Sequence, residues 1–401
     1  MHSKAGITLH IDLTIVLIVS IVVVLVLIFK KTNVAISLAV GSMLFGFLAF
    51  GYRILQVIPQ AFNISMTRTI LALILAMFLA ELYGSVGASQ KLIEGLTFFS
   101  PSVAALLTPA IIGLLPMPGG AYVSAVILNE LYETLRLSAE SKTFINYWFR
   151  HIWITIWPLY QSVILASGLL GISIGKISIL NLPIMLAATL VGTITGLLLI
   201  YKSADKECFE EKRGKLKELL HVWPFLLIAL TVVVLRIDLV IALILVLLSV
   251  IMIYKPSRGA LTSSIKRALN PTFVAIIVFS FIYSEFMKES GIAHDLVVKL
   301  SPLADLAAFA IPFLIVVGTG VEFTFVALAF PPLAPMLKAS NDVLLLAFTG
   351  GFAGALLSPA HACLILSSGY YKADLTKVYQ TLIPSTIATV AIVLLIKAAL
   401  Y

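Results

Sequence analysis

The stretch LLPMPGGAYVSAV, residues 114–126, puts two prolines and two adjacent glycines between hydrophobic runs. Proline removes a backbone donor and ends a helix, whereas paired glycines permit a tight turn. The flanking runs, SPSVAALLTPAIIGLL and AYVSAVILNELYETL, have about 15 residues each and are typical of short helices. The stretch therefore predicts two short helices joined by a non-helical connection.

The rest of the chain is unusually hydrophobic. Of its 401 residues, 61% are hydrophobic and 11% are charged, and the mean hydropathy is +1.10, well outside the range of soluble domains. Runs at 13–31, 189–202 and 237–255 end in Lys, as membrane helices do. The first run is too long for a removable signal peptide and lacks a small-residue cleavage site. These features predict a multi-pass protein of the cell membrane, embedded in the lipid bilayer.

In a membrane, the two short helices around residues 114–126 acquire a specific meaning. A helix needs roughly 20 residues to cross the hydrocarbon layer, so neither helix spans alone. We expect a re-entrant hairpin over residues 101–135, whose non-helical tip lies in mid-membrane against protein or a watery cavity. A single kinked spanning helix is the alternative, because proline and glycine are frequent in membrane helices.

The two halves of the chain show an internal duplication. WPLYQSVILASG (157–168) aligns with SPAHACLILSSG (358–369), so that Pro158 meets Pro359 at an offset of 201 residues, and Gly119 meets Gly320 at the same offset. The first copy covers residues 1–201, a charged linker covers 202–218, and the second copy covers 219–401, with its hairpin at 303–337. Expected helices lie at 10–29, 33–51, 69–88 and 177–201, then at 219–235, 237–254, 271–288 and 376–399, with helices interrupted near Pro158 and Pro359.

An odd number of crossings in each copy fixes their relative orientation. Five crossings per copy require two homologous copies to be inverted with respect to each other. The predicted fold class is therefore an all-α polytopic membrane protein of two inverted repeats. Each repeat has five transmembrane helices, one of them broken by proline, and one re-entrant hairpin.

Positive charges predict the topology. With both termini outside, most of the 27 Lys and Arg residues face the cytoplasm, including those of the linker and Arg150. No arginine occurs at either hairpin tip in the sequence, so we expect no bidentate arginine clamp for a carboxylate. The net charge of +8 lies in short loops, which excludes nucleic acid as the expected partner. The only cysteines, Cys208 and Cys363, are too few for a disulfide framework.

The breaks predict a binding site near the midplane. Helix amino-terminal ends near Gly120, Gln161, Gly320 and Ala362 carry free N–H groups that suit an anion. Carbonyl groups near Pro116 and Val317 suit sodium, the one cofactor-like ion that we expect. The expected substrate-binding residues are Pro118, Gly119, Gly120, Tyr160, Gln161, Ser162, Thr319, Gly320, His361 and Cys363. The expected ion-coupling residues are Pro116, Met117, Val317, Gly318, Glu322 and Thr324.

Glu322 is the most informative of these residues, because a carboxylate deep in a membrane is costly and usually functional. It could bind a cation, carry a proton or pair with a backbone donor. His361 could equally be a core histidine bonded to a nearby carbonyl. Glu81 and Glu285 occupy matching positions near helix ends, where a solvated role is favoured.

The motifs LLPMPGGA (114–121) and LLSPAHACLILSSGYY (356–371) resemble a family of membrane proteins called domain-of-unknown-function 401. The architecture resembles the wider ion transporter superfamily, whose members carry dicarboxylates, citrate, gluconate, arsenite or sodium. Better-studied dicarboxylate members have Ser-Asn-Thr at each tip, and this chain does not. The resemblance implies a homodimer in which a transport domain moves against a scaffold domain, as in an elevator.

These observations predict a secondary active transporter of a small, anionic solute, coupled to sodium or protons. A cation/proton antiporter of the same fold is the alternative, with Glu322 as the exchanging group. An intramembrane hydrolase using Ser358 and His361 has no supporting motif. We therefore do not expect an enzyme. No nucleotide-binding loop is present in the sequence, so a primary pump is not expected either.

Overall fold

The computed structural model describes residues 12–115, 120–203 and 214–400, and within these ranges the chain is helical without any strand. The first half contains α1 (Leu13–Phe29), α2 (Val34–Phe50), α3 (Ile54–Val57), α4 (Ile64–Ser85), α5 (Ala88–Leu96), α6 (Pro101–Gly113), α7 (Gly120–Thr134), α8 (Ala139–His151), α9 (Gln161–Leu170), α10 (Ile174–Leu180) and α11 (Leu182–Ser203). The second half contains α12 (Trp223–Ile228), α13 (Leu239–Tyr254), α14 (Arg258–Ala268), α15 (Pro271–Glu289), α16 (Ile292–Leu300), α17 (Ala304–Thr319), α18 (Thr324–Ala339), α19 (Asn341–Leu357), α20 (Ala362–Tyr371) and α21 (Leu375–Leu400).

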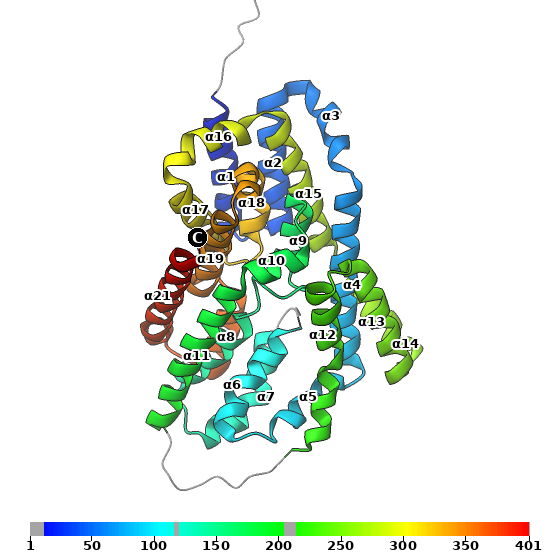
Figure 1. Ribbon diagram of the computed structural model, residues 1–401, viewed down its shortest axis with the longest axis vertical. Coiled ribbons are helices and arrows are strands. Elements are labelled where there is room, and N and C mark those ends of the chain that lie inside the picture. Colours follow the sequence, from blue (N-terminus) through cyan, green and yellow to red (C-terminus); the bar gives the residue numbers. More distant parts are fainter. Residues whose placement is uncertain (1–11, 116–119, 204–213, 401) are drawn as a thin grey trace, which may run out of the picture.

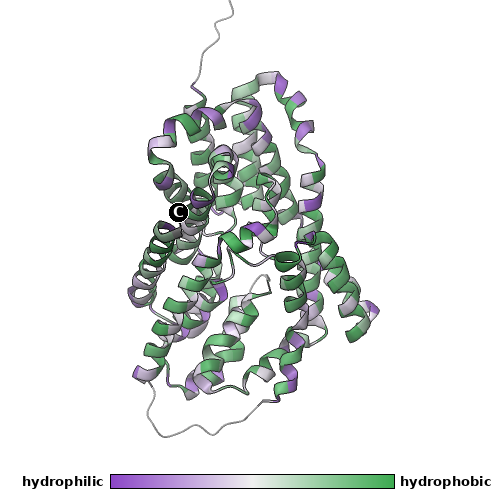
Figure 2. Cartoon of the chain, in the orientation of Figure 1, coloured by the Kyte–Doolittle hydropathy of each residue, from purple (hydrophilic) through white to green (hydrophobic). Residues whose placement is uncertain are grey.

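Eight helical segments of the described chain are long and apolar enough to cross a membrane, or nine if α9 and α10, bent by 116°, count as one. Hydrophobic residues cover most helices, and hydrophilic residues lie largely near helix ends (Figure 2). The protein is therefore a multi-pass membrane protein, as the composition predicts.

Short helices account for most differences from the sequence prediction. The helix expected at 177–201 is divided into α10 and α11. The one expected at 219–235 is present as a continuous helical segment, Leu216–Val234, in which α12 lies between a 3-10 turn and the π-helical turn Ala229–Val234. α5, α14 and α16 were not expected at all. Each has only 9 or 11 residues and carries both charged and apolar side chains, so a hydropathy argument for spanning segments overlooks it.

Two equivalent glycines start two of these short helices. Gly87 precedes α5 with φ of 70°, and Gly291 precedes α16 with φ of 76°. This left-handed conformation is costly for residues with a Cβ atom. The chain thus turns sharply after α4 and after α15, and the nearby Glu81 and Glu285 pair with Arg267 Nε at 2.5 Å and Lys288 Nζ at 2.8 Å.

Two helix pairs occupy opposite halves of the molecule in Figure 1, α6 with α7 below and α17 with α18 above. α17 also packs very closely on α19, because Gly350 and Gly354 bring the helix backbone against Phe309 and Phe313. A Cβ atom at these glycines would lie 2.1 Å and 2.6 Å from the Phe309 and Phe313 carbonyl oxygens. α19 is accordingly almost wholly buried, and it leads directly into the second proline-containing break.

Candidate functional site

A cavity of about 190 Å³ lies where three breaks between helices converge. Its walls come from the end of α8, the starts of α9 and α20, the segment between α17 and α18, and α15. The lining residues are Arg150, His151, Tyr160, Gln161, Phe273, Gly320, Val321, Glu322, Phe323, His361, Ala362 and Cys363. It combines one guanidinium, one carboxylate, two imidazoles and one thiol.

Arg150 is the principal charged group of this site. It is only 4% exposed, and its guanidinium lies against Gly120, where a Cβ atom would be 2.5 Å from Nη2. Its Nε and Nη1 atoms are buried and have no hydrogen-bond partner within the described chain. A buried arginine with free donors is costly unless a ligand supplies acceptors.

One sequence expectation about arginine is therefore wrong, because a guanidinium does stand beside the start of α7. Arg150 is also buried within the protein, unlike the exposed cation that a topology marker requires. The positive-inside argument treats every cation as a topology marker, which fails for one buried in the protein. The sequence did carry a signal, since Arg150 sits within FINYWFRHIWITIW (144–157), a run without any Gly or Pro to form a solvated loop.

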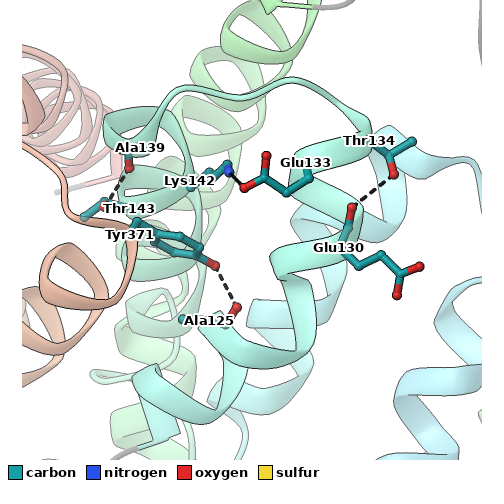
Figure 3. A network of polar contacts seen from close by, with 8 residues as sticks. All are labelled: Ala125, Glu130, Glu133, Thr134, Ala139, Lys142, Thr143 and Tyr371. Atoms are coloured by element: carbon teal, nitrogen blue, oxygen red, sulfur yellow. Dashed lines mark hydrogen bonds and ion pairs between the residues drawn. The ribbon is translucent and has the colours of Figure 1, made fainter.

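A buried polar network holds α7, α8 and α20 together around Arg150. The Ser124 hydroxyl donates to Asn146 Oδ1 at 2.6 Å, and Asn146 Nδ2 donates to Ala121 O at 3.0 Å and to Ser367 Oγ at 2.8 Å. Tyr371 donates to Ala125 O at 3.0 Å, and Lys142 pairs with Glu133 near the carboxyl end of α7 (Figure 3). The three helices therefore form one unit that fixes Gly120 beside Arg150.

The segment between α8 and α9 caps the carboxyl end of α6. Trp153 Nε1 donates to Ala110 O at 2.8 Å, Trp157 Nε1 donates to Leu114 O at 3.0 Å, and the Tyr160 hydroxyl donates to Gly113 O at 2.8 Å. The last carbonyls of a helix lack intrahelical partners, and buried ones need donors. Aromatic side chains supply them here, which keeps the end of α6 close to the cavity.

Gly320 brings the break between α17 and α18 into close contact with the break between α19 and α20. Gly320 has φ of 68° and is the C-cap of α17, and a Cβ atom there would lie 2.5 Å from Ala360 O. Ser358 Oγ donates to Val317 O at 2.9 Å. The expectation that a helix starts near Gly320 is wrong, because α18 begins only at Thr324. The extra residues 320–323 place Glu322 in the cavity wall.

The predicted site residues divide into three groups. Tyr160, Gln161, Gly320, Glu322, His361 and Cys363 line the cavity, and Gly120 touches Arg150 behind it. Ser162, Thr319, Thr324, Val317 and Gly318 do not line it: Ser162 donates to Ile154 O at 2.5 Å, the Thr319 and Thr324 hydroxyls bond each other at 2.6 Å, and Gly318 faces Leu25 and Phe29. Pro116, Met117, Pro118 and Gly119 lie outside the described residues.

The two imidazoles of the cavity face each other. His151 Nε2 lies 3.1 Å from His361 Nε2, and His151 Nδ1 lies 2.5 Å from Tyr147 O. His361 is thus neither remote from the site nor bonded to a carbonyl through a ring nitrogen, and its Nδ1 has no partner in the part of the chain that the structure describes. Neither His151 nor Arg150 is among the site residues that the sequence predicts.

A protein of known structure has a similar architecture, and a known family matches the sequence. The chain resembles the crystal structure of the Alcanivorax borkumensis YdaH transporter, described as having an unusual topology, with a TM-score of 0.54 at 13% sequence identity, over 83% of this chain and 86% of that one. No curated protein matches the sequence. The family model "Protein of unknown function (DUF401)" matches residues 12–400. The chain belongs to the DUF401 family.

Proposed function

We propose that this protein is a secondary active transporter of a small anion, driven by a sodium or proton gradient. The observation that carries the proposal is the buried Arg150, whose Nε and Nη1 donors lack partners in the described chain and which lines a cavity of about 190 Å³. A guanidinium presents its donors as a planar fork that suits a carboxylate or another oxyanion.

Helix ends reinforce the preference for an anion. α7 starts at Gly120 beside the guanidinium, α9 starts at Gln161, and α20 starts at Ala362. The amino-terminal end of a helix has unpaired N–H groups and partial positive charge. Gln161 and Ala362 both line the cavity, so an anion placed there would interact with two helix ends as well as with Arg150.

Glu322 supplies the coupling in this proposal. It is the only carboxylate among the residues that line the described cavity, and it is half-buried. A cation or a proton that neutralises Glu322 would remove the repulsion between this carboxylate and the anionic substrate. The substrate and the coupling ion would therefore favour each other's binding, which is the requirement for symport.

An elevator-type movement of two inverted repeats is the proposed transport mechanism. Support comes from the matched order of elements: α4, α5, α6 and α7 in one half correspond to α15, α16, α17 and α18 in the other. α6–α7 and α17–α18 are the proposed re-entrant hairpins, and both termini are proposed to face outside. The fold similarity to YdaH supports a transporter. A homodimer with separate scaffold and transport domains completes the proposal.

A cation/proton antiporter is the second candidate, and Glu322 favours it. In that mechanism Glu322 alone exchanges the two cations, and Arg150 only maintains the local charge balance. The two candidates differ in whether the protein binds an anion: the symporter does, and the antiporter does not.

A thermal-shift screen of anions, with and without sodium, tests the proposal in the detergent-purified protein. A ligand raises the unfolding midpoint according to its concentration relative to Kd. We expect stabilisation by an anion in the wild type and in the surface control Arg53→Gln, and its loss in Arg150→Gln. Because charged hydrogen bonds contribute about 1.5–3 kcal/mol, Arg150→Gln should weaken binding by about 10- to 150-fold. Equal stabilisation of Arg150→Gln and wild type would contradict the anion site.

Gradient-driven cation exchange in proteoliposomes without any anion would favour the antiporter.

A further inference from the structure

Three side chains of the cavity have the composition of a transition-metal site. The ligand atoms of His151, His361 and Cys363 all lie within 4.8 Å of one another. His151 and His361 are 3% and 4% exposed, and Cys363 is half-buried. Imidazole and thiolate are the ligands that Zn²⁺ and related borderline cations prefer, in contrast to the oxygen ligands of sodium or magnesium.

We propose that His151, His361 and Cys363 bind one Zn²⁺-class cation, whose fourth coordination position opens to the cavity. The distance of 3.1 Å between His151 Nε2 and His361 Nε2 is close to the edge of a tetrahedron with metal–nitrogen bonds of about 2.0–2.1 Å, which is roughly 3.3 Å. A small outward turn of either ring admits the ion. This proposal stands on its own geometry and does not rest on transport.

The hydrogen bonding of His151 prepares it as a ligand. Its Nδ1 lies 2.5 Å from Tyr147 O, and because a carbonyl only accepts, Nδ1 carries the proton of the neutral ring. The lone pair is then on Nε2, which points at His361. Metal-binding histidines commonly donate their second ring nitrogen to a carbonyl in this way, which fixes the tautomer and the ring orientation.

Binding through Nε2 involves only one ring nitrogen of His361. Its Nε2 contacts only the other imidazole, while its Nδ1 is buried without a partner in the described chain. An ion between the two Nε2 atoms replaces the His–His contact and leaves the ring proton of His361 on Nδ1. The geometry of the Nε2 atoms, and not the unpaired Nδ1, therefore carries the proposal.

The charges of the cavity are compatible with a divalent ion. Binding releases the Cys363 thiol proton to water in the cavity, so a thiolate bonds the metal. The thiolate and the Glu322 carboxylate then balance the ion's two charges, and Arg150 retains its affinity for an anion. An anion held by Arg150 would be well placed to fill the fourth position, because Arg150 and all three ligands line the same cavity.

The chain offers a clean experiment, because it has only two cysteines. Cys208→Ser leaves Cys363 as the sole thiol and is the matched control for Cys363→Ser. In the metal-free, detergent-purified full chain, Co²⁺ titration of wild type and Cys208→Ser should give a thiolate-to-cobalt charge-transfer band and intense tetrahedral visible bands, saturating at one ion per chain. Cys363→Ser should lose the charge-transfer band, and His361→Ala should weaken binding at least tenfold. A charge-transfer band that survives in Cys363→Ser, or no saturable cobalt spectrum in wild type, overturns the proposal.

A second measurement needs no substitution in the site. In Cys208→Ser, Zn²⁺ should slow alkylation of Cys363 by a small maleimide at least tenfold, and a chelator should restore the rate. An unchanged rate at saturating Zn²⁺ contradicts the site even if a variant misfolds. Arg150→Gln separates the two proposals, since it should retain the cobalt spectrum while losing stabilisation by anions.

Discussion

Gly320→Ala tests whether the close contact between Gly320, at the end of α17, and Ala360, in the break between α19 and α20, shapes the cavity. Gly320 has φ of 68°, and a Cβ atom there would lie 2.5 Å from the Ala360 carbonyl oxygen and 2.6 Å from its carbon. Gly171 has the same φ of 68° but nothing within 4 Å of its Cβ position, so it is a matched control. A left-handed conformation costs alanine about 1–2 kcal/mol, and overpacking against backbone costs about 1–3 kcal/mol more. We expect Gly171→Ala to destabilise by about 1–2 kcal/mol and Gly320→Ala by about 2–5 kcal/mol.

The assay is unfolding of both variants in the same detergent, followed by intrinsic fluorescence. Gly320→Ala should unfold at a clearly lower midpoint than Gly171→Ala. It should also lose stabilisation by any anion that stabilises wild type, because Ala360 directly precedes the cavity residue His361. Identical midpoints for the two variants would refute the reasoning. They would show that the backbone around Ala360 moves aside without loss of stability, so the close contact with Gly320 does not fix the shape of the cavity.

Three further predictions concern charge and polarity. Glu322→Gln should insert and fold normally but transport without response to a sodium or pH gradient in proteoliposomes. Glu130→Gln, at an exposed site, should behave as wild type in the same assay. A full gradient response in Glu322→Gln would show that Glu322 has only a structural role. Asn146→Ala should lower the free energy of unfolding by about 2–4 kcal/mol, because three buried partners lose their hydrogen bonds; a midpoint within error of wild type contradicts this. The backbone N–H groups of Glu140 itself and of Asp374 lower the pKa of Glu140, so its carboxylate stabilises the fold above its ordinary pKa and the contribution fades as the pH falls through the lowered one. Glu140→Gln should therefore reduce the acid sensitivity of the unfolding midpoint, and an unchanged pH profile would exclude that contribution.

Hydropathy and helix breakers are sufficient to predict an all-helical, multi-pass membrane protein and the places of two of its breaks. Pro158 falls between α8 and α9, and Pro359 falls between α19 and α20, where the sequence predicts interruptions. The reason is local: a residue without a backbone donor, or with access to positive φ, acts on its own segment whatever surrounds it. The same locality predicted that Tyr160, Gln161, His361 and Cys363 would follow breaks and lie together.

Other parts of the site depend on contacts between distant segments. The Asn146–Ser367 hydrogen bond joins residues 221 positions apart, and no periodicity within one sequence encodes such a pair. Arg150 was misassigned because cations were counted as loop markers, although its apolar neighbours already argued for burial. Short amphipathic helices such as α5 and α16 were missed because they bury one face against the protein without needing the length of a span.

In its metal-free form, the cavity places one positive and one negative group among neutral side chains, and this pairing bears on the proposed coupling. Arg150 and Glu322 line the same cavity, so without a substrate their charges offset each other. An anion alone adds a net negative charge to a site of low dielectric, and a cation alone adds a positive one, and both are costly there. An anion on Arg150 together with a cation or proton on Glu322 restores neutrality, so the doubly loaded and the empty cavity are the two states with least electrostatic cost. A transport domain that moves freely only in those two states couples the fluxes of anion and cation without any direct contact between them.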